Sequence, residues 1–197
     1  MRPGLIVLKW KPVALLAIIA GVTAYVQAGE PTAFALIKEG NRYVGEQARD
    51  KIVQIRSDKS VGTLVPAIWY VVYYDTTATL KATEVKFAGG KMLEVKRPLR
   101  LLEPVTGEDK QLDRKKFKVD SDKALKIATR QPVLEKLKLT SSQWWLGRGD
   151  DGSPVWRIRF WAAKLRKPSE EADIGDIYLF AENGKIEKTD LHINRVD

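Results

Sequence analysis

The chain of 197 residues contains no cysteine and a single histidine, His192. Without cysteine, the protein has no disulfide, no thiolate metal ligand, no cysteine nucleophile and no site for a lipoprotein anchor. One histidine leaves no material for a multi-histidine metal centre, and we interpret His192, near the C-terminus, as a structural or surface residue. The sequence therefore predicts no catalytic residues, no metal site and no cofactor.

Adjacent acidic residues, notably Asp150-Asp151 and Glu170-Glu171, could in principle serve as the carboxylate pair of a glycosidase. The segment from Asp150 to Pro154 is typical of a tight turn between strands, and Glu170-Glu171 lies in a charged loop. The turn also lacks the alternating oxygen ligands and the terminal glutamate of a calcium loop. We interpret both pairs as structural, and the adhesion-like tripeptide Arg148-Gly149-Asp150 as a chance match.

The N-terminus has the pattern of a secretion signal. Arg2, Lys9 and Lys11 precede an uncharged, mostly apolar run from Pro12 to Val26, and Val26-Gln27-Ala28 has the small residues that a signal peptidase accepts. The run of about 15 residues is shorter than the roughly 20 that a membrane-spanning helix needs, so an uncleaved anchor is the weaker alternative. We predict a signal peptide over residues 1–28, a periplasmic or extracellular location and no stable membrane span after cleavage.

Composition indicates a folded and moderately basic mature protein. The chain is 44% hydrophobic and has six Trp, six Tyr and five Phe, which is ample for one domain or two small ones. Removal of three of the 34 basic residues with the leader leaves 31 against 25 acidic ones, a net charge of +6. This excess suits an anionic envelope polymer, lipid headgroups or an acidic protein, or it serves solubility alone, and the location argues against nucleic acid.

Two stretches of the mature chain repeat one order of signals, a helical pattern followed by four strand-like runs. Helical patterns begin at Pro31 and, behind the cap candidates Asp120, Ser121 and Asp122, at Ala124. The strand-like runs are 51–56, 66–73, 83–87 and 92–95 in the first stretch and 143–146, 154–160, 177–180 and 186–193 in the second.

Alternation within the strand-like runs predicts which residues enter the core. Trp69, Val71 and Tyr73 share one face of their run, and Trp156, Ile158 and Phe160 share one face of theirs. We therefore predict an α+β fold of two tandem units, each a helix packed on a four-stranded antiparallel sheet. The first unit covers residues 29–105 and the second residues 106–197, with the boundary in a charged, turn-rich link near residue 106.

The second unit resembles a PepSY domain. The resemblance rests on the Ala-x-x-Ile-Ala helix pattern at Ala124 to Ala128, the Pro-x-Trp-x-Ile strand at Pro154 to Ile158 and the Asn-Gly-Lys-Ile hairpin at Asn183 to Ile186. The first unit is a fainter copy. PepSY domains are similar in architecture to the repeats of a β-lactamase-inhibiting protein, and the resemblance implies binding or inhibition of another protein, with no catalytic residues. A long charged insert from Lys164 to Asp176 departs from the family pattern.

The opposite face of the second sheet is the candidate binding surface. If Trp156 and its partners point inward, alternate residues of the same strand point outward and the charged insert follows them. The candidate ligand-binding residues are Arg157, Arg159, Trp161, Lys164 and Arg166. Arginine binds carboxylates and phosphates through paired hydrogen bonds, and tryptophan offers a flat surface to a sugar or peptide. The alternative is that these side chains only pair with neighbouring strands, or that Trp161 packs on the other unit. Trp144 and Trp145 face opposite ways if they lie in a strand, so we expect one of them to join the surface.

Three functional hypotheses follow, of which an enzyme that uses Asp151 or Glu171 is the weakest. The first is an exported, non-enzymatic PepSY-like module that binds or inhibits a secreted or envelope protein. The alternative is a module that binds an anionic polymer or small ligand through the basic aromatic sheet face.

Overall fold

The computed structural model describes residues 31–97 and 110–197 of the chain. The predicted leader, residues 1–28, and the predicted boundary between residues 105 and 106 lie outside these ranges. Within the two ranges, no helix is long and apolar enough to cross a membrane.

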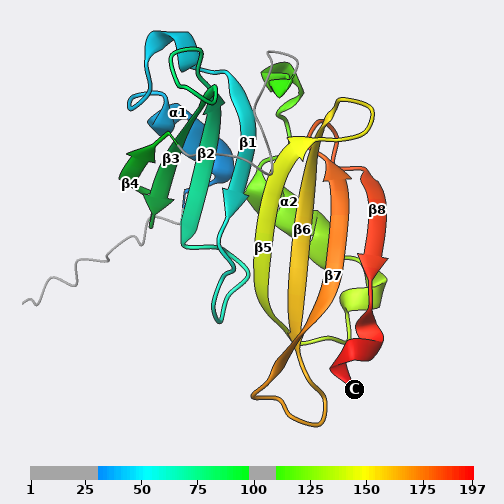
Figure 1. The fold of residues 1–197 in the computed structure, drawn as a ribbon. Coiled ribbons are helices and arrows are strands. Elements are labelled where there is room, and N and C mark those ends of the chain that lie inside the picture. Colours follow the sequence, from blue (N-terminus) through cyan, green and yellow to red (C-terminus); the bar gives the residue numbers. More distant parts are fainter. Residues whose placement is uncertain (1–30, 98–109) are drawn as a thin grey trace, which may run out of the picture.

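The described residues form two α-helices and eight β-strands, joined by turns and short 3₁₀ helices (Figure 1). The helices are α1 (Ala33–Gly40) and α2 (Ser121–Thr129). The strands are β1 (Ile52–Ser57), β2 (Ile68–Tyr74), β3 (Ala82–Ala88), β4 (Lys91–Lys96), β5 (Leu139–Arg148), β6 (Pro154–Ala163), β7 (Glu171–Phe180) and β8 (Ile186–Leu191).

The fold prediction of two tandem units, each with its own four-stranded sheet, is wrong. All eight strands form one continuous antiparallel sheet in the order β4-β3-β2-β1-β5-β6-β7-β8. The two predicted sheets join because β1 pairs with β5, where Ile55 is opposite Leu146 and Arg56 is opposite Trp145. Pairing at this position provides hydrogen-bond partners for backbone N–H and C=O groups that two edge strands would otherwise expose.

Both helices lie on the same side of the sheet, behind the strands in Figure 1. Their N-termini are joined by two side chains that precede or begin α2. Asp120 accepts hydrogen bonds from the backbone N–H of Ser121 at 2.7 Å and of Phe34 at 3.0 Å. Ser121 Oγ accepts a third from the backbone N–H of Ala33 at 3.0 Å. These contacts confirm the predicted cap and also hold α1 against α2, because the same groups satisfy the free N–H groups of both helices.

The predicted core faces are confirmed. Trp69, Val71 and Tyr73 are at most 4% exposed, and Trp156, Ile158 and Phe160 are fully buried. Residues of both helices and of both halves of the sheet belong to one continuous apolar cluster. Trp144 links the halves, since its ring centroid is 6.0 Å from that of Trp69 and 5.6 Å from that of Trp156.

The predicted charged insert from Lys164 to Asp176 is only partly a loop. Strand β7 begins at Glu171, so the loop between β6 and β7 is short. Asp173 and Asp176 are strand residues that pair with arginine on β6. A bulge in this pairing coincides with Gly175, whose φ of +101° favours glycine and whose Cα lies against the backbone of Asp190.

The turn between β2 and β3 is organised by a buried carboxylate, Asp75, which is 1% exposed. Burial by itself raises the pKa of Asp75, but hydrogen bonds from Thr83, Thr77 and Gln47 outweigh it and lower the pKa from 3.8 to about 2. The Thr83 hydroxyl donates at 2.6 Å, and the backbone N–H and hydroxyl of Thr77 donate at 2.9 and 2.7 Å.

The lowered pKa of Asp75 predicts an acid-sensitive contribution to stability. Because the carboxylate is favoured in the folded state, its contribution is complete above pH 4 and is lost as the pH falls through about 2. We expect Asp75→Asn to remove about 2 kcal/mol from the pH-dependent part of the free energy of unfolding between pH 4.5 and pH 2. Urea unfolding followed by tryptophan fluorescence measures this difference. An unchanged pH dependence of the free energy of unfolding in Asp75→Asn would refute the assignment.

Candidate functional site

A groove of about 800 Å³ lies on the sheet face opposite the helices. Strands β1, β5, β6, β7 and β8 contribute to it, together with the turn between β5 and β6. Among the described residues it is lined by Arg56, Ser57, Gln143, Trp144, Trp145, Arg148, Gly149, Asp150, Val155, Arg157, Arg159, Tyr178, Glu187 and Lys188. The lining is dominated by arginine and aromatic side chains, with acidic residues at the end near the β5–β6 turn.

Five of the lining residues form one straight row across the sheet, which we call the groove row. Each is opposite the next in the strand register, and each comes from a different neighbouring strand. In spatial order the groove row is Arg56, Trp145, Arg157, Tyr178 and Lys188. Cations and aromatic rings therefore alternate at intervals of one strand spacing, about 4.8 Å, which places successive cations about 10 Å apart.

Trp145 is the second member of the groove row, between Arg56 and Arg157. Its indole lies along its own strand over Gly147, where an added Cβ would be only 2.0 Å from the ring. A glycine at this position is what allows the indole to lie down beside the strand. Trp144 points to the opposite face and is 2% exposed, so Trp145 is the member of the pair that joins the groove.

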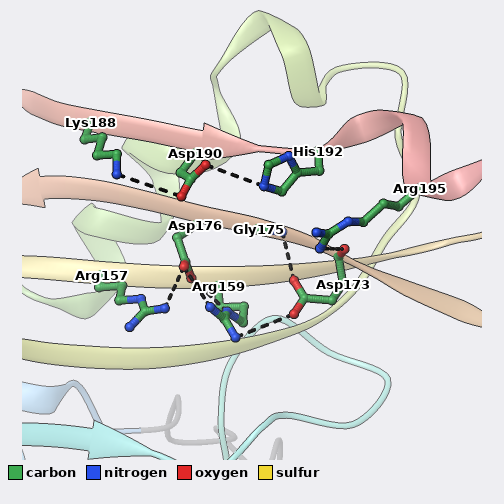
Figure 2. A network of polar contacts seen from close by, with 9 residues as sticks. All are labelled: Arg157, Arg159, Asp173, Gly175, Asp176, Lys188, Asp190, His192 and Arg195. Carbon is green, nitrogen blue, oxygen red and sulfur yellow. Dashed lines mark hydrogen bonds and ion pairs between the residues drawn. The ribbon is translucent and has the colours of Figure 1, made fainter.

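Two arginines of β6 converge on one carboxylate of β7, as Figure 2 shows. Arg157 Nη2 is 2.7 Å from Asp176 Oδ2, and Arg159 donates to both oxygens of Asp176 at 2.9 Å. The Asp176 side chain is 5% exposed, whereas those of Arg157 and Arg159 are 40% and 35% exposed. The carboxylate thus lies beneath the guanidinium groups and holds them in place.

These contacts keep all three groups charged. Burial alone raises the pKa of Asp176, but the hydrogen bonds from Arg159 and Arg157 outweigh it and lower the pKa below its ordinary value. The hydrogen bonds to Asp176 raise the pKa of both guanidinium groups. Since a guanidinium has five N–H donors and Arg157 uses Nη2 for Asp176, it keeps further donors for a ligand.

The other cations of the groove row also have acidic neighbours. Arg56 Nη2 is 2.9 Å from Glu84 Oε2, and Lys188 Nζ is 3.9 Å from Asp190, which also pairs with His192 (Figure 2). Asp173 lies 3.6 Å from Arg159. The groove row itself contains no acid, but the adjacent rows nearly balance its charge. The groove therefore presents aligned donors and rings at short range rather than a large net charge.

The sequence-predicted site residues separate into two groups. Arg157 and Arg159 line the groove. Trp161 lies outside it, beneath Lys59 of the β1–β2 loop, whose Nζ is 4.3 Å from the ring centroid. Lys164 pairs with Glu170 at 2.8 Å in the β6–β7 loop, and Arg166 is exposed in the same loop. The structure does not bring these three residues to the groove.

Sequence reasoning missed Arg56, Tyr178, Lys188 and Gln143 as groove residues. Arg56 and Gln143 stand on strands that the sequence located, and alternation could have assigned them to the outer face. Their meeting depends on the pairing of β1 with β5, for which a single sequence has no local signal.

Acidic side chains lie at the end of the groove near the β5–β6 turn. No group of three or more His, Asp or Glu residues in ranges 31–97 and 110–197 is arranged to hold a metal ion. Asp150, at the acidic end of the groove, belongs to a tight turn in which Gly152 donates its backbone N–H to Gly149. Burial and the nearby Asp151 and Asp150 raise the pKa of Glu187, which lies at the same end.

Comparison with known proteins finds no match to this chain among family models, curated proteins or solved structures. The PepSY resemblance therefore stays a prediction.

Proposed function

We propose that this protein is a non-catalytic binding module that holds an anionic ligand in the groove on the open face of its sheet. The observation that carries the proposal is the groove row, in which three cations and two aromatic rings alternate across five adjacent strands. Nothing in that row is acidic, and every member lines the groove.

The chemistry of the groove row suits a ligand with both carboxylates and flat rings. Guanidinium groups bind carboxylates through paired, charge-assisted hydrogen bonds, and Asp176 already orients two of them. The indole of Trp145 provides an apolar surface between Arg56 and Arg157 on which the face of a sugar ring can pack. An anionic carbohydrate has both features, so it is the ligand that we favour.

A protein partner is the competing interpretation. Arginine, tryptophan and tyrosine are also the residues that dominate protein–protein hot spots, and a partner with exposed carboxylates would meet the same groove row. The regular alternation across the strands favours a repeating polymer over the irregular surface of a folded protein.

Substitution of both groove arginines tests the proposal. We expect the protein to bind hyaluronan and polygalacturonate but not neutral dextran, and Arg157→Ala/Arg159→Ala to weaken the binding at least about tenfold, because each charge-assisted hydrogen bond contributes roughly 1.5–3 kcal/mol. Isothermal titration calorimetry gives the affinities. Lys123→Ala/Lys126→Ala, on α2 behind the sheet, removes the same charge and should change binding less than about twofold.

Further measurements keep the result interpretable. Arg157→Lys/Arg159→Lys retains the charge above Asp176 and should fold, but it should still bind weakly since lysine cannot form the paired hydrogen bonds. Equal losses of affinity in the groove variant and the α2 variant would show that the polymer binds through non-specific charge attraction. Shortening of the polymer by the protein would contradict a non-catalytic role. Capture of a protein by wild type but not by the double arginine variant, with no polymer bound, would favour the protein partner.

A further inference from the structure

The groove row continues beyond the groove. On the other side of Arg56, Tyr70 of β2 is opposite Arg56, and Lys86 of β3 is opposite Tyr70. The row thereby gains one more aromatic ring and one more cation. The extended row is Lys86, Tyr70, Arg56, Trp145, Arg157, Tyr178 and Lys188.

Each tyrosine of the extended row lies between two cations. The Tyr70 ring centroid is 3.8 Å from the Arg56 guanidinium carbon and 5.4 Å from Lys86 Nζ. The Tyr178 ring centroid is 5.8 Å from the Arg157 guanidinium carbon and 5.7 Å from Lys188 Nζ. The alternating cations and rings therefore make cation–π contacts with one another, and these contacts fix the positions of the charges.

The extended row has a defined length and a defined charge spacing. Seven adjacent strands contribute one residue each, so the distance from Lys86 to Lys188 is six strand spacings, about 29 Å. Its four cations follow one another at about 10 Å. The row ends on β4 at Glu94, which is opposite Lys86 and pairs with Lys96, so a chain of like charges would not continue past that strand.

We propose that the extended row is a track for a linear glycan that carries one carboxylate on every second sugar. Sugar rings without charge lie over the aromatic positions, where Trp145 offers a ring face and the two tyrosines, whose faces hold cations, offer their edges. The uronate rings place their carboxylates at the cations. This inference rests on the proposed function and adds the class of the ligand, its charge spacing and the number of repeats that the site accommodates.

The spacing separates this class from two other polyanions. In an extended acidic peptide, side chains on the same side are about 6.6–6.8 Å apart, so the second carboxylate already falls short of the second cation. A polymer with a charge on every sugar presents twice as many carboxylates as the extended row has cations, and half of them would lie over aromatic rings beside Asp176 and Glu84. Both ligands leave charges unpaired, which costs affinity.

Oligosaccharides of two lengths test the track. The probes are a hyaluronan tetrasaccharide with two carboxylates and an octasaccharide with four. We expect the octasaccharide to bind the full-length protein at least about tenfold more tightly, because the later repeats bind intramolecularly. Lys86→Ala should weaken the octasaccharide about threefold to tenfold and leave the tetrasaccharide unchanged, since the shorter ligand fits within the groove. Lys91→Ala on β4 is the matched control, with no effect on either ligand.

Other outcomes distinguish failure of the track from failure of the proposed function. Equal affinity for the two lengths, or tighter binding of an oligogalacturonate or an oligoglutamate with the same number of carboxylates, would overturn the track and its spacing but leave an anion-binding groove. No binding of any anionic probe would overturn the proposed function as well. If Lys86→Ala has the same melting temperature as wild type, its loss of affinity is a local effect and does not come from unfolding.

Discussion

Replacement of Trp156 with alanine is expected to lower the free energy of unfolding by about 3–5 kcal/mol, the range for large aromatic residues removed from protein cores. Trp156 is fully buried, its indole packs edge-on against Trp144 at 5.6 Å, and it stacks with Phe34 of α1 at 6.0 Å. The indole N–H also donates to the Val119 carbonyl at 2.8 Å, an acceptor that would be left without this donor. Urea unfolding followed by far-UV circular dichroism gives the free energy.

Two further tryptophan variants separate the causes of this loss. Trp156→Phe keeps most of the packing but loses the hydrogen bond, so it should cost about 1–2 kcal/mol. Trp161→Ala removes an indole from the opposite face, where the ring is only partly buried, and should cost about 1 kcal/mol or less. If Trp156→Ala is no more destabilising than Trp161→Ala, Trp156 is not the centre of a core shared by the helices and the sheet.

Alternation of side chains was enough to locate individual strands and their buried faces. Trp69 and Trp156 were placed in the core because a strand directs every second residue to the same side. The same rule put Arg157 and Arg159 on the outer face, where they line the groove. These inferences succeeded because they depend only on residues within one strand.

Sheet organisation depends on pairing between distant strands, and there the prediction was wrong. The pattern of β1 predicts a strand but contains no information about which strand lies along its edge. The pairing of β1 with β5 joins the two predicted sheets into one and brings Arg56 beside Trp145. The groove could not be predicted without it, because its members come from both sides of that junction.

Because of its charged residues, the first half of β7 was not predicted as a strand. Asp173 and Asp176 are typical of loops when considered alone. In the folded protein they are strand residues whose charges are paired with Arg159 and Arg157 across the sheet. Pairing partners in the next strand, which local propensity does not include, explain why the charged segment is a strand from Glu171 onward.

The junction of β1 and β5 is short and is completed by buried serines. Only two residue pairs are in register, Ile55 with Leu146 and Arg56 with Trp145. Beyond them the Ser57 hydroxyl accepts a hydrogen bond from the backbone N–H of Trp144 at 3.0 Å. Ser142 accepts from the Trp144 indole N–H and donates to the Leu64 carbonyl, both at 2.7 Å. Side chains thus replace the backbone ladder where the two strands separate.

Removal of these hydroxyls is therefore expected to weaken the sheet at its centre. Ser57→Ala and Ser142→Ala each leave buried polar groups of Trp144 without a partner, at about 1–3 kcal/mol per site, so the double variant should lose about 4 kcal/mol. Hydrogen exchange locates the effect: the amides of Trp144 and Arg56 should exchange faster relative to those of β3 and β7. Ser169→Ala, in the exposed β6–β7 loop, is the control. Uniformly faster exchange in every strand would show that the serines stabilise the fold as a whole. Faster exchange confined to β1 and β5 would show that the serines close the junction on which the groove depends.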